Sequence, residues 1–246
     1  MPRAHALDGE LAGAVGGPAH LKVGRVIAAG VLVAVGTGWF LLILASVSGE
    51  FGLARADWPI LTWLVEHRTP VLTSVTTVIA TVSGPVGMPI IVLVTTLVWA
   101  LTSRRLWRPV LLASAMILGV LLTFLIAHLV GRPRPPEEFM LLGFDPTPSF
   151  PSGHAVGVGD FLLVGGHLIC SRMWSVTRIV LCALTAVIGI LLVDFSRLYL
   201  GYHWFTDVVA ALGLSVAVLG LVIAVDAVRQ SRGERYAQSR TKEFHW

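Results

Sequence analysis

The sequence predicts an all-α protein, a polytopic membrane helical bundle of about six transmembrane helices. Hydrophobic residues make up 55% of the 246 residues and charged residues only 13%, whereas soluble domains carry about 25% charged residues. The mean hydropathy is +0.81, and several apolar runs reach the ~20 residues that a helix needs to cross a bilayer. A chain of this length suits one bundle rather than two domains.

The predicted spans are separated by polar or Gly/Pro-rich connections. They cover residues 25–47, 86–102, 108–130, 155–171, 176–196 and 206–228. We expect the first span to be retained rather than cleaved as part of a signal peptide, because the preceding residues are mixed in character and lack a small-residue cleavage pattern. The two cysteines, Cys170 and Cys182, are too few for a disulfide framework or a zinc site.

Two further helical segments are predicted between the first and second spans. Residues 55–67 mix Trp58 and Trp63 with charged residues, as helices at a membrane interface do. Residues 70–83 are apolar but too short to cross a bilayer, and the stretch SGPVG at 83–87 interrupts the helix. We therefore expect 70–83 to form a kinked lead-in to the second span. A separate crossing by 70–83 would change the topology.

Basic residues are distributed unevenly between the two sides of the predicted membrane. With a cytoplasmic N-terminus, 13 of the 18 lysines and arginines fall in cytoplasmic segments, which explains the net charge of +4 without a nucleic-acid partner. The outer side keeps Arg55, Arg68, Arg132, Arg134 and Arg197. This bias predicts that both termini are cytoplasmic. The chain then divides into a cytoplasmic segment (1–24), a membrane domain (25–228) and a basic cytoplasmic tail (229–246).

Three polar stretches are predicted to lie together at the outer end of the bundle. GRPRPP (131–136) follows the third span, PSGH (151–154) begins the fourth, and SRLYLGYHWFTD (196–207) connects the fifth to the sixth. The loop 131–153 holds six of the 13 prolines, so it is stiff and extended rather than a span. Ionisable residues are costly at the edge of a membrane, and their presence here predicts a functional site.

The arginines of these stretches suit the binding of a phosphate group. Arginine is always charged and forms paired hydrogen bonds with phosphate oxygens, and Arg134 and Arg197 are the best candidates. Ser152 precedes the fourth helix and can cap it, which leaves the N–H groups of Gly153 and the next residue as an anion site. Arg132 could contact the phosphate or support the loop, and both options stay open.

Two histidines and an aspartate complete the candidate catalytic set. His203 and Asp207 are four residues apart and share one face of a helix. The aspartate can accept a hydrogen bond from one ring nitrogen, which leaves the other unprotonated for attack on phosphorus. His154, on another helix, is expected to protonate the leaving oxygen and then to activate water. A metal at His203 and Asp207 is disfavoured, because the arginines would repel a dication and no third ligand is evident; no cofactor is predicted.

The order and spacing of these residues resemble the type 2 phosphatidic acid phosphatase superfamily. Its signature is Lys, six residues and Arg-Pro, then Pro-Ser-Gly-His, then Ser-Arg, five residues, His, three residues and Asp. The second and third parts match in full, at Pro151, Ser152, Gly153, His154, Ser196, Arg197, His203 and Asp207. Arg134 and Pro135 match the end of the first part, and the resemblance covers about residues 25–228.

One position departs from this signature. The lysine should fall at position 127, which is Ala127, and no lysine occurs between Lys22 and Lys242. In the family this lysine helps to hold the substrate phosphate. Arg132 or His128 would have to supply the missing charge, or the site would bind phosphate less tightly.

The resemblance implies a multi-pass cell-membrane protein that acts as a lipid phosphatase, with its site facing outside the cytoplasm. The implied substrates are polyprenyl diphosphate, phosphatidate or phosphatidylglycerophosphate, held in the bilayer by their tails. Two alternatives stay open: a lipid-linked phosphotransferase that uses the same histidine, and a catalytically impaired binding or transport protein. Asp160 and Asp194 lie inside or near predicted spans, where a carboxylate is energetically unfavourable. We hypothesise that they support the site.

Overall fold

The chain is helical in all its regular structure within residues 18–103, 106–171 and 175–243, the part that a computed structural model describes. These residues form eight α-helices and two 3₁₀ helices and contain no β-strand, which confirms the all-α prediction. The α-helices are α2 (Pro18–Gly49), α3 (Asp57–Glu66), α4 (Pro70–Val82), α5 (Gly87–Thr102), α6 (Trp107–Val130), α7 (Gly153–Cys170), α8 (Val176–Tyr199) and α9 (Phe205–Glu243). The 3₁₀ helices are η1 (Gly52–Ala56) and η2 (Glu137–Phe139).

Among the described residues, five helices are long and apolar enough to cross a membrane, namely α2, α6, α7, α8 and α9. The pair α4 and α5 passes the same test only when taken together, and the two are bent by 51° at the break between them. With 13 residues, α4 alone would span only about 20 Å of a hydrocarbon layer about 30 Å thick. The prediction of about six spans is therefore confirmed, with the expected kink before α5.

The break between α4 and α5 follows from local residue types. Thr69 caps the start of α4 by accepting a hydrogen bond from the Leu72 N–H, and Pro70 occupies a first-turn position where no N–H is required. At the other end, Pro85 cannot continue the ladder of α4. A Cβ atom added to Gly87 would overlap the carbonyl oxygen of Val82, so this turn requires glycine.

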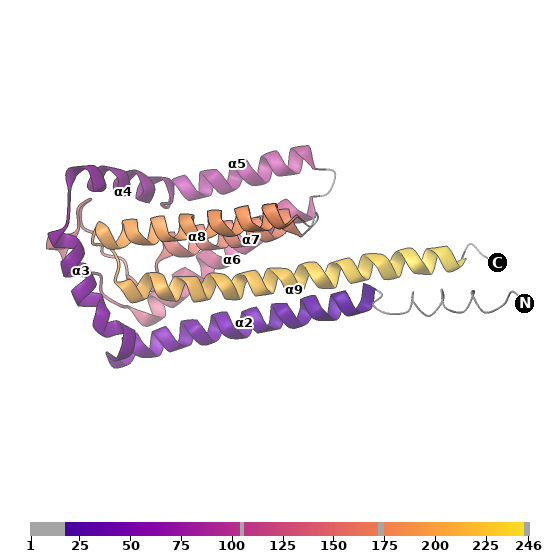
Figure 1. The fold of residues 1–246 in the computed structure, drawn as a ribbon, viewed down its shortest axis with the longest axis horizontal. Helices are drawn as coiled ribbons and strands as arrows, with labels where there is room; N and C mark the ends of the chain where they lie inside the picture. Colours follow the sequence, from indigo (N-terminus) through magenta and orange to yellow (C-terminus); the bar gives the residue numbers. More distant parts are fainter. Residues whose placement is uncertain (1–17, 104–105, 172–174, 244–246) are drawn as a thin grey trace, which may run out of the picture.

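Helix α3 crosses one end of the bundle, close to the end of α8 and the start of α9 (Figure 1). Its buried residues, Asp57, Leu61 and Leu64, share one helical face. Trp58 and Trp63 are 51% and 56% exposed on the opposite side. The helix lies within the 55–67 segment that we expect at a membrane interface, and its inner face brings one acidic side chain, Asp57, into the bundle.

Helix α7 lies at the centre of the bundle and packs against α6, α8 and α9. Val164 and Leu168, on its buried side, are fully inaccessible. Close packing of this kind leaves a helix little freedom to shift. The N-terminus of α7, where His154 lies, is therefore held at a fixed position relative to its neighbours.

Helix α9 is longer than the predicted sixth span. Residues 229–246 are expected to form a basic cytoplasmic tail, and the helix continues into this segment as far as Glu243. The segment contains arginine, glutamine, glutamate, alanine and lysine and no proline, and most of these residues favour helix. The change in composition near residue 229 therefore does not end the helix.

Glycines allow α2 and α9 to approach closely. A Cβ atom added to Gly36 would lie 2.5 Å from the Ala217 nitrogen and 2.6 Å from the Gly213 oxygen. A Cβ at Gly220 would lie 2.8 Å from the Ala29 oxygen. Small residues of this kind let membrane helices pack with their backbones in contact, so α2 holds α9 in place along its length.

We predict that Gly36→Ala destabilises the protein, because the added methyl group would collide with backbone atoms of α9 that cannot rotate away. Overpacking should lower the free energy of unfolding by about 1–3 kcal/mol, which corresponds to a drop in Tm of roughly 2–10 °C. The drop is measured by thermal unfolding in detergent. Gly38→Ala is the matched control, because a Cβ there meets no atom within 4 Å. Equal melting temperatures for the two variants would contradict the close α2–α9 contact.

Candidate active site

The three polar stretches meet at one end of the bundle. The C-termini of α6 and α8 and the N-termini of α7 and α9 all lie at this end, beside α3 (Figure 1). The loop 131–152 joins α6 to α7, and residues 200–204 join α8 to α9. The predicted juxtaposition of the three stretches is therefore observed.

His203 lies in the turn before α9 and is 3% exposed. Its Nδ1 lies 2.9 Å from the Ser149 carbonyl oxygen and 3.3 Å from Asp207 Oδ2. Both neighbours are acceptors, so Nδ1 carries the hydrogen. On the other side of the ring, Arg134 donates to Nε2 at 3.3 Å. Nε2 is therefore unprotonated in the neutral ring, and its electron pair faces Arg134.

The surroundings of His203 favour its neutral form. Burial is the main cause that lowers the pKa of the imidazole well below its ordinary value, and the charges of Arg134 and Arg197 lower it further. The ring is therefore unprotonated at neutral pH. A neutral imidazole with one fixed tautomer is the form that can act as a nucleophile.

Asp207 is fully buried in the first turn of α9. Its Oδ1 accepts a hydrogen bond from Arg132 at 2.5 Å. Its Oδ2 accepts from the Trp204 N–H at 2.9 Å, which satisfies an unpaired donor at the helix start, and it also faces the His203 ring. Both oxygens are engaged, so the carboxylate has a single orientation.

Arg132 bridges two carboxylates. Besides its contact with Asp207, its second terminal nitrogen lies 2.6 Å from Asp57 Oδ2 at the start of α3. It also donates to Thr206 Oγ1 at 2.8 Å and stacks over Trp204, 5.5 Å from the ring centre. Of the two roles left open for Arg132, phosphate contact and loop support, this geometry favours a supporting one.

Arg134 reaches into the cluster from the loop after α6. It donates to the Tyr202 carbonyl at 2.7 Å, to Thr147 Oγ1 at 2.9 Å and to His203 Nε2, and it pairs with Asp145 at 3.0 Å. These contacts hold the guanidinium beside the free nitrogen of His203. A phosphate group bound to that nitrogen would therefore lie next to a fixed positive charge.

Arg197 comes from the last turn of α8 and is 5% exposed. Its guanidinium lies over the Tyr202 ring, 4.7 Å from the ring centre. Its Nε is buried and has no hydrogen-bond partner within the described part of the chain. An unused, buried cationic donor is costly unless a ligand completes it.

The start of α7 supplies backbone donors and a second histidine. Ser152 is buried and caps the helix by accepting from the Ala155 N–H at 3.4 Å, as predicted, whereas Gly153 is exposed. His154 is half-buried and interacts electrostatically with Arg197, His203 and Arg134. A Cβ added to Gly84 would lie 3.3 Å from His154 Nε2, so the α4–α5 break lies against this ring.

Several residues of the cluster were not predicted from the sequence. Asp57 holds Arg132, and the Ser149 carbonyl shares the hydrogen of His203 Nδ1. Asp145 pairs with Arg134. Only Asp57 left a signal, as an acidic residue at the start of a mainly apolar helix that contains two tryptophans.

Other candidates lie apart from the cluster. His128 is exposed, donates from Nδ1 to the Phe124 carbonyl of its own helix at 2.8 Å and lies against the Phe124 ring in a tilted arrangement. Asp160 is fully buried in the bundle core, against Gly119 of α6. Asp194 is half-buried on α8. A supporting role for these two aspartates stays a prediction.

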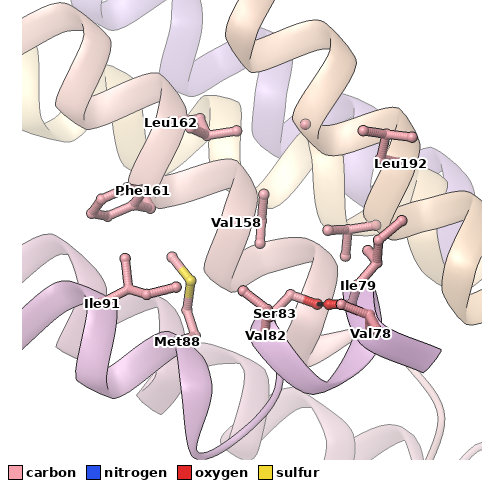
Figure 2. A pocket seen from close by; sticks show the side chains of 12 residues that line it. Val78, Ile79, Val82, Ser83, Met88, Ile91, Val158, Phe161, Leu162 and Leu192 are labelled. Atoms are coloured by element: carbon pink, nitrogen blue, oxygen red, sulfur yellow. Dashed lines mark hydrogen bonds between the residues drawn. The ribbon is translucent and has the colours of Figure 1, made fainter. Parts of the chain in front are cut away.

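An apolar pocket of about 340 Å³ borders the α4–α5 break, the segment that lies against His154. Side chains from α4, α5, α7 and α8 point toward one another around it, among them Val82, Met88, Val158 and Leu192 (Figure 2). Leu192 and Val82 are 48% and 51% exposed on the outer surface of the bundle, so the pocket opens sideways. Its inner end reaches Val158, one helical turn from His154.

Known proteins share both the sequence pattern and the fold. A family model described as "PAP2 superfamily" matches residues 108–230. A putative undecaprenyl-diphosphatase, YbjG, of Escherichia coli is 27% identical over 143 residues, which are 57% of this chain and 66%, just under two thirds, of that protein. Phosphatidylglycerophosphatase B of Bacillus subtilis is 28% identical over 190 residues, 76% of this chain and 91% of that protein.

A solved structure agrees with these sequence matches. The crystal structure of a transmembrane PAP2-type phosphatidylglycerolphosphate phosphatase from B. subtilis superposes with a TM-score of 0.70 at 23% identity, over 78% of this chain and 96% of that chain. At this identity the superposition shows the shared fold. The family model, which spans half of the sequence, shows that the chain belongs to the PAP2 superfamily.

Proposed function

We propose that this chain is a membrane lipid phosphatase that hydrolyses a lipid phosphate or diphosphate through a phosphohistidine at His203. The observation that carries this proposal is the unprotonated Nε2 of a buried, neutral imidazole, to which the Arg134 guanidinium donates at 3.3 Å. Relatives named as an undecaprenyl-diphosphatase and a phosphatidylglycerophosphatase support lipid phosphates as the class of substrate.

In the first step, His203 Nε2 attacks phosphorus while the bond from phosphorus to the leaving oxygen breaks. Asp207 stabilises the positive charge that develops on the ring by accepting from Nδ1. His154 gives a proton to the leaving oxygen. Arg134, Arg197 and the N–H groups at the start of α7 hold the phosphoryl oxygens, whose charge is spread over three positions in the transition state.

In the second step, water attacks phosphorus of the phosphohistidine. His154, now unprotonated, takes a proton from this water, and the bond between phosphorus and Nε2 breaks. The electron pair returns to His203 and inorganic phosphate leaves. The proton that His154 donates in the first step is recovered in the second, so both histidines return to their starting forms, and the proposed cycle uses no metal ion or other cofactor.

The sideways-opening apolar pocket supports a substrate with a hydrocarbon tail. A lipid in the bilayer could place its tail against Val82, Val158 and Leu192 while its head group reaches His154 and His203. The pocket volume of about 340 Å³ accommodates part of one chain, with the remainder in the surrounding lipid. A water-soluble phosphate ester would gain nothing from this surface.

We predict that the purified protein in detergent with EDTA releases inorganic phosphate from at least one of three lipids: polyprenyl diphosphate, phosphatidate and phosphatidylglycerophosphate. His203→Ala should lower kcat at least about 1,000-fold, because it removes the nucleophile. His67→Ala, an exposed histidine on the end of α3, is the control and should keep normal activity.

Three results of this assay would contradict the proposal. Phosphate release that requires an added divalent cation would point to a metal enzyme. Phosphate release that survives in His203→Ala would exclude His203 as the nucleophile. Transfer of phosphate to a lipid or sugar acceptor in place of water would establish the transferase alternative. Mass spectrometry of the products separates free phosphate from a phosphorylated acceptor.

We further propose that the site faces outside the cytoplasm, on the basis of the charge bias around the spans. In a chain whose cysteines are replaced by serine, Glu138→Cys in the loop after α6 should react with a membrane-impermeant maleimide in intact cells. Leu106→Cys, at the opposite end of the bundle and 60% exposed, should react only after permeabilisation. The reverse pattern would show that the site faces the cytoplasm.

A further inference from the structure

Asp57 is hydrogen-bonded to Arg132 and Thr206 of the cluster. It lies far from the three motifs in sequence and outside residues 108–230, which the family model matches. Its side chain is 5% exposed. Its Oδ2 accepts from Arg132 at 2.6 Å and from Thr206 Oγ1 at 2.7 Å, and its Oδ1 accepts from the Thr206 N–H at 2.8 Å. Water satisfies the hydrogen-bonding capacity of a carboxylate on the surface, whereas the buried Asp57 carboxylate is satisfied by these three donors.

The first consequence concerns the orientation of the catalytic histidine. Arg132 links Asp57 to Asp207, and Asp207 in turn faces His203 Nδ1. A guanidinium held at both terminal nitrogens has one orientation, whereas one held by a single carboxylate can rotate about that contact. Asp57 therefore fixes Arg132, and Arg132 fixes the Asp207 carboxylate that orients the ring.

The second consequence concerns the start of α9. The Thr206 N–H is one of the donors without an intrahelical partner at a helix N-terminus, and Asp57 accepts from it. A negative charge at this position is also favourable for the helix dipole. The bond ties α3 to the turn that carries His203 and to the residue next to Asp207.

The third consequence concerns the distribution of charge. Arg132 faces two carboxylates, so its positive charge is compensated within the protein. Arg134 has one carboxylate partner, Asp145, which is 32% exposed, and Arg197 lies against the Tyr202 ring. Asp57 thus keeps Arg132 in the scaffold and leaves Arg134 and Arg197 as the cations that face a bound phosphate.

We propose that Asp57 is a positioning residue for phosphoryl transfer, acting through Arg132 and Asp207 on the orientation of His203. The proposal rests on the function proposed above. It assigns a role in the reaction to α3, a helix that contributes no residue to the three motifs.

The test is steady-state kinetics of Asp57→Asn in detergent with the best lipid substrate. Asparagine has the same shape and can still accept from Thr206, but its amide group places a donor against the Arg132 donor. We expect kcat to fall about 10- to 100-fold, the loss typical for the outer partners of metal-ligating histidines, with KM within about twofold. Glu66→Gln, the exposed acidic residue at the other end of α3, is the matched control.

A second variant separates positioning from folding. Arg132→Lys keeps a positive charge but cannot bridge two carboxylates, and we expect a similar loss of kcat. The double variant should lose no more than about threefold beyond Arg132→Lys, because both changes break the same link. A purely structural role predicts instead that kcat falls only in proportion to the folded fraction, measured by thermal unfolding.

The outcomes are distinguishable. Asp57→Asn with kcat within threefold of the wild type, or losses that multiply in the double variant, would overturn the positioning role while leaving the phosphatase proposal intact. A wild-type protein that releases no phosphate from any of the three lipids would overturn both proposals together.

Discussion

The ion pair between Arg132 and Asp207 holds the candidate site together. Asp207 is fully buried, and a buried carboxylate is stable only when its charge and its lone pairs are compensated. Arg132 supplies the compensating positive charge, and the Trp204 N–H and the His203 ring donate hydrogen bonds to the second carboxylate oxygen, Oδ2. Removal of one partner from such a pair typically costs about 3–5 kcal/mol. The carboxylate therefore stays where it is, and the imidazole keeps one tautomer and one orientation.

The helices around this ion pair bring together the groups that a lipid phosphatase requires. Backbone donors come from the start of α7, a cation from the end of α8, and the proposed nucleophile, His203, from the turn before α9. The α4–α5 break lies against His154 and borders the apolar pocket. In the function we propose, polar chemistry and a hydrocarbon tail meet at this break, which explains why a span would be interrupted there.

The part of the site that the sequence predicted is the part with local spacing. His203 and Asp207 are one helical turn apart, and Ser152 directly precedes the helix that it caps, so helical geometry alone places them. Asp57 and Arg132 are 75 residues apart, so no local sequence pattern predicts that they are in contact. The sequence left the role of Arg132 open between phosphate contact and loop support, and only this contact favours support. The spans followed from hydropathy, whereas the extension of α9 depends on helix propensity beyond the apolar segment.

The most direct test of the central claim is to trap the covalent intermediate. The wild-type protein would be mixed with ³²P-labelled lipid substrate, quenched in alkali within one turnover, and digested for mass spectrometry. The structure predicts an alkali-stable, acid-labile phosphoryl group on the peptide that contains His203, and its amount should decay as free phosphate appears. Normal phosphate release without label on His203, or label on a different residue, would contradict the mechanism.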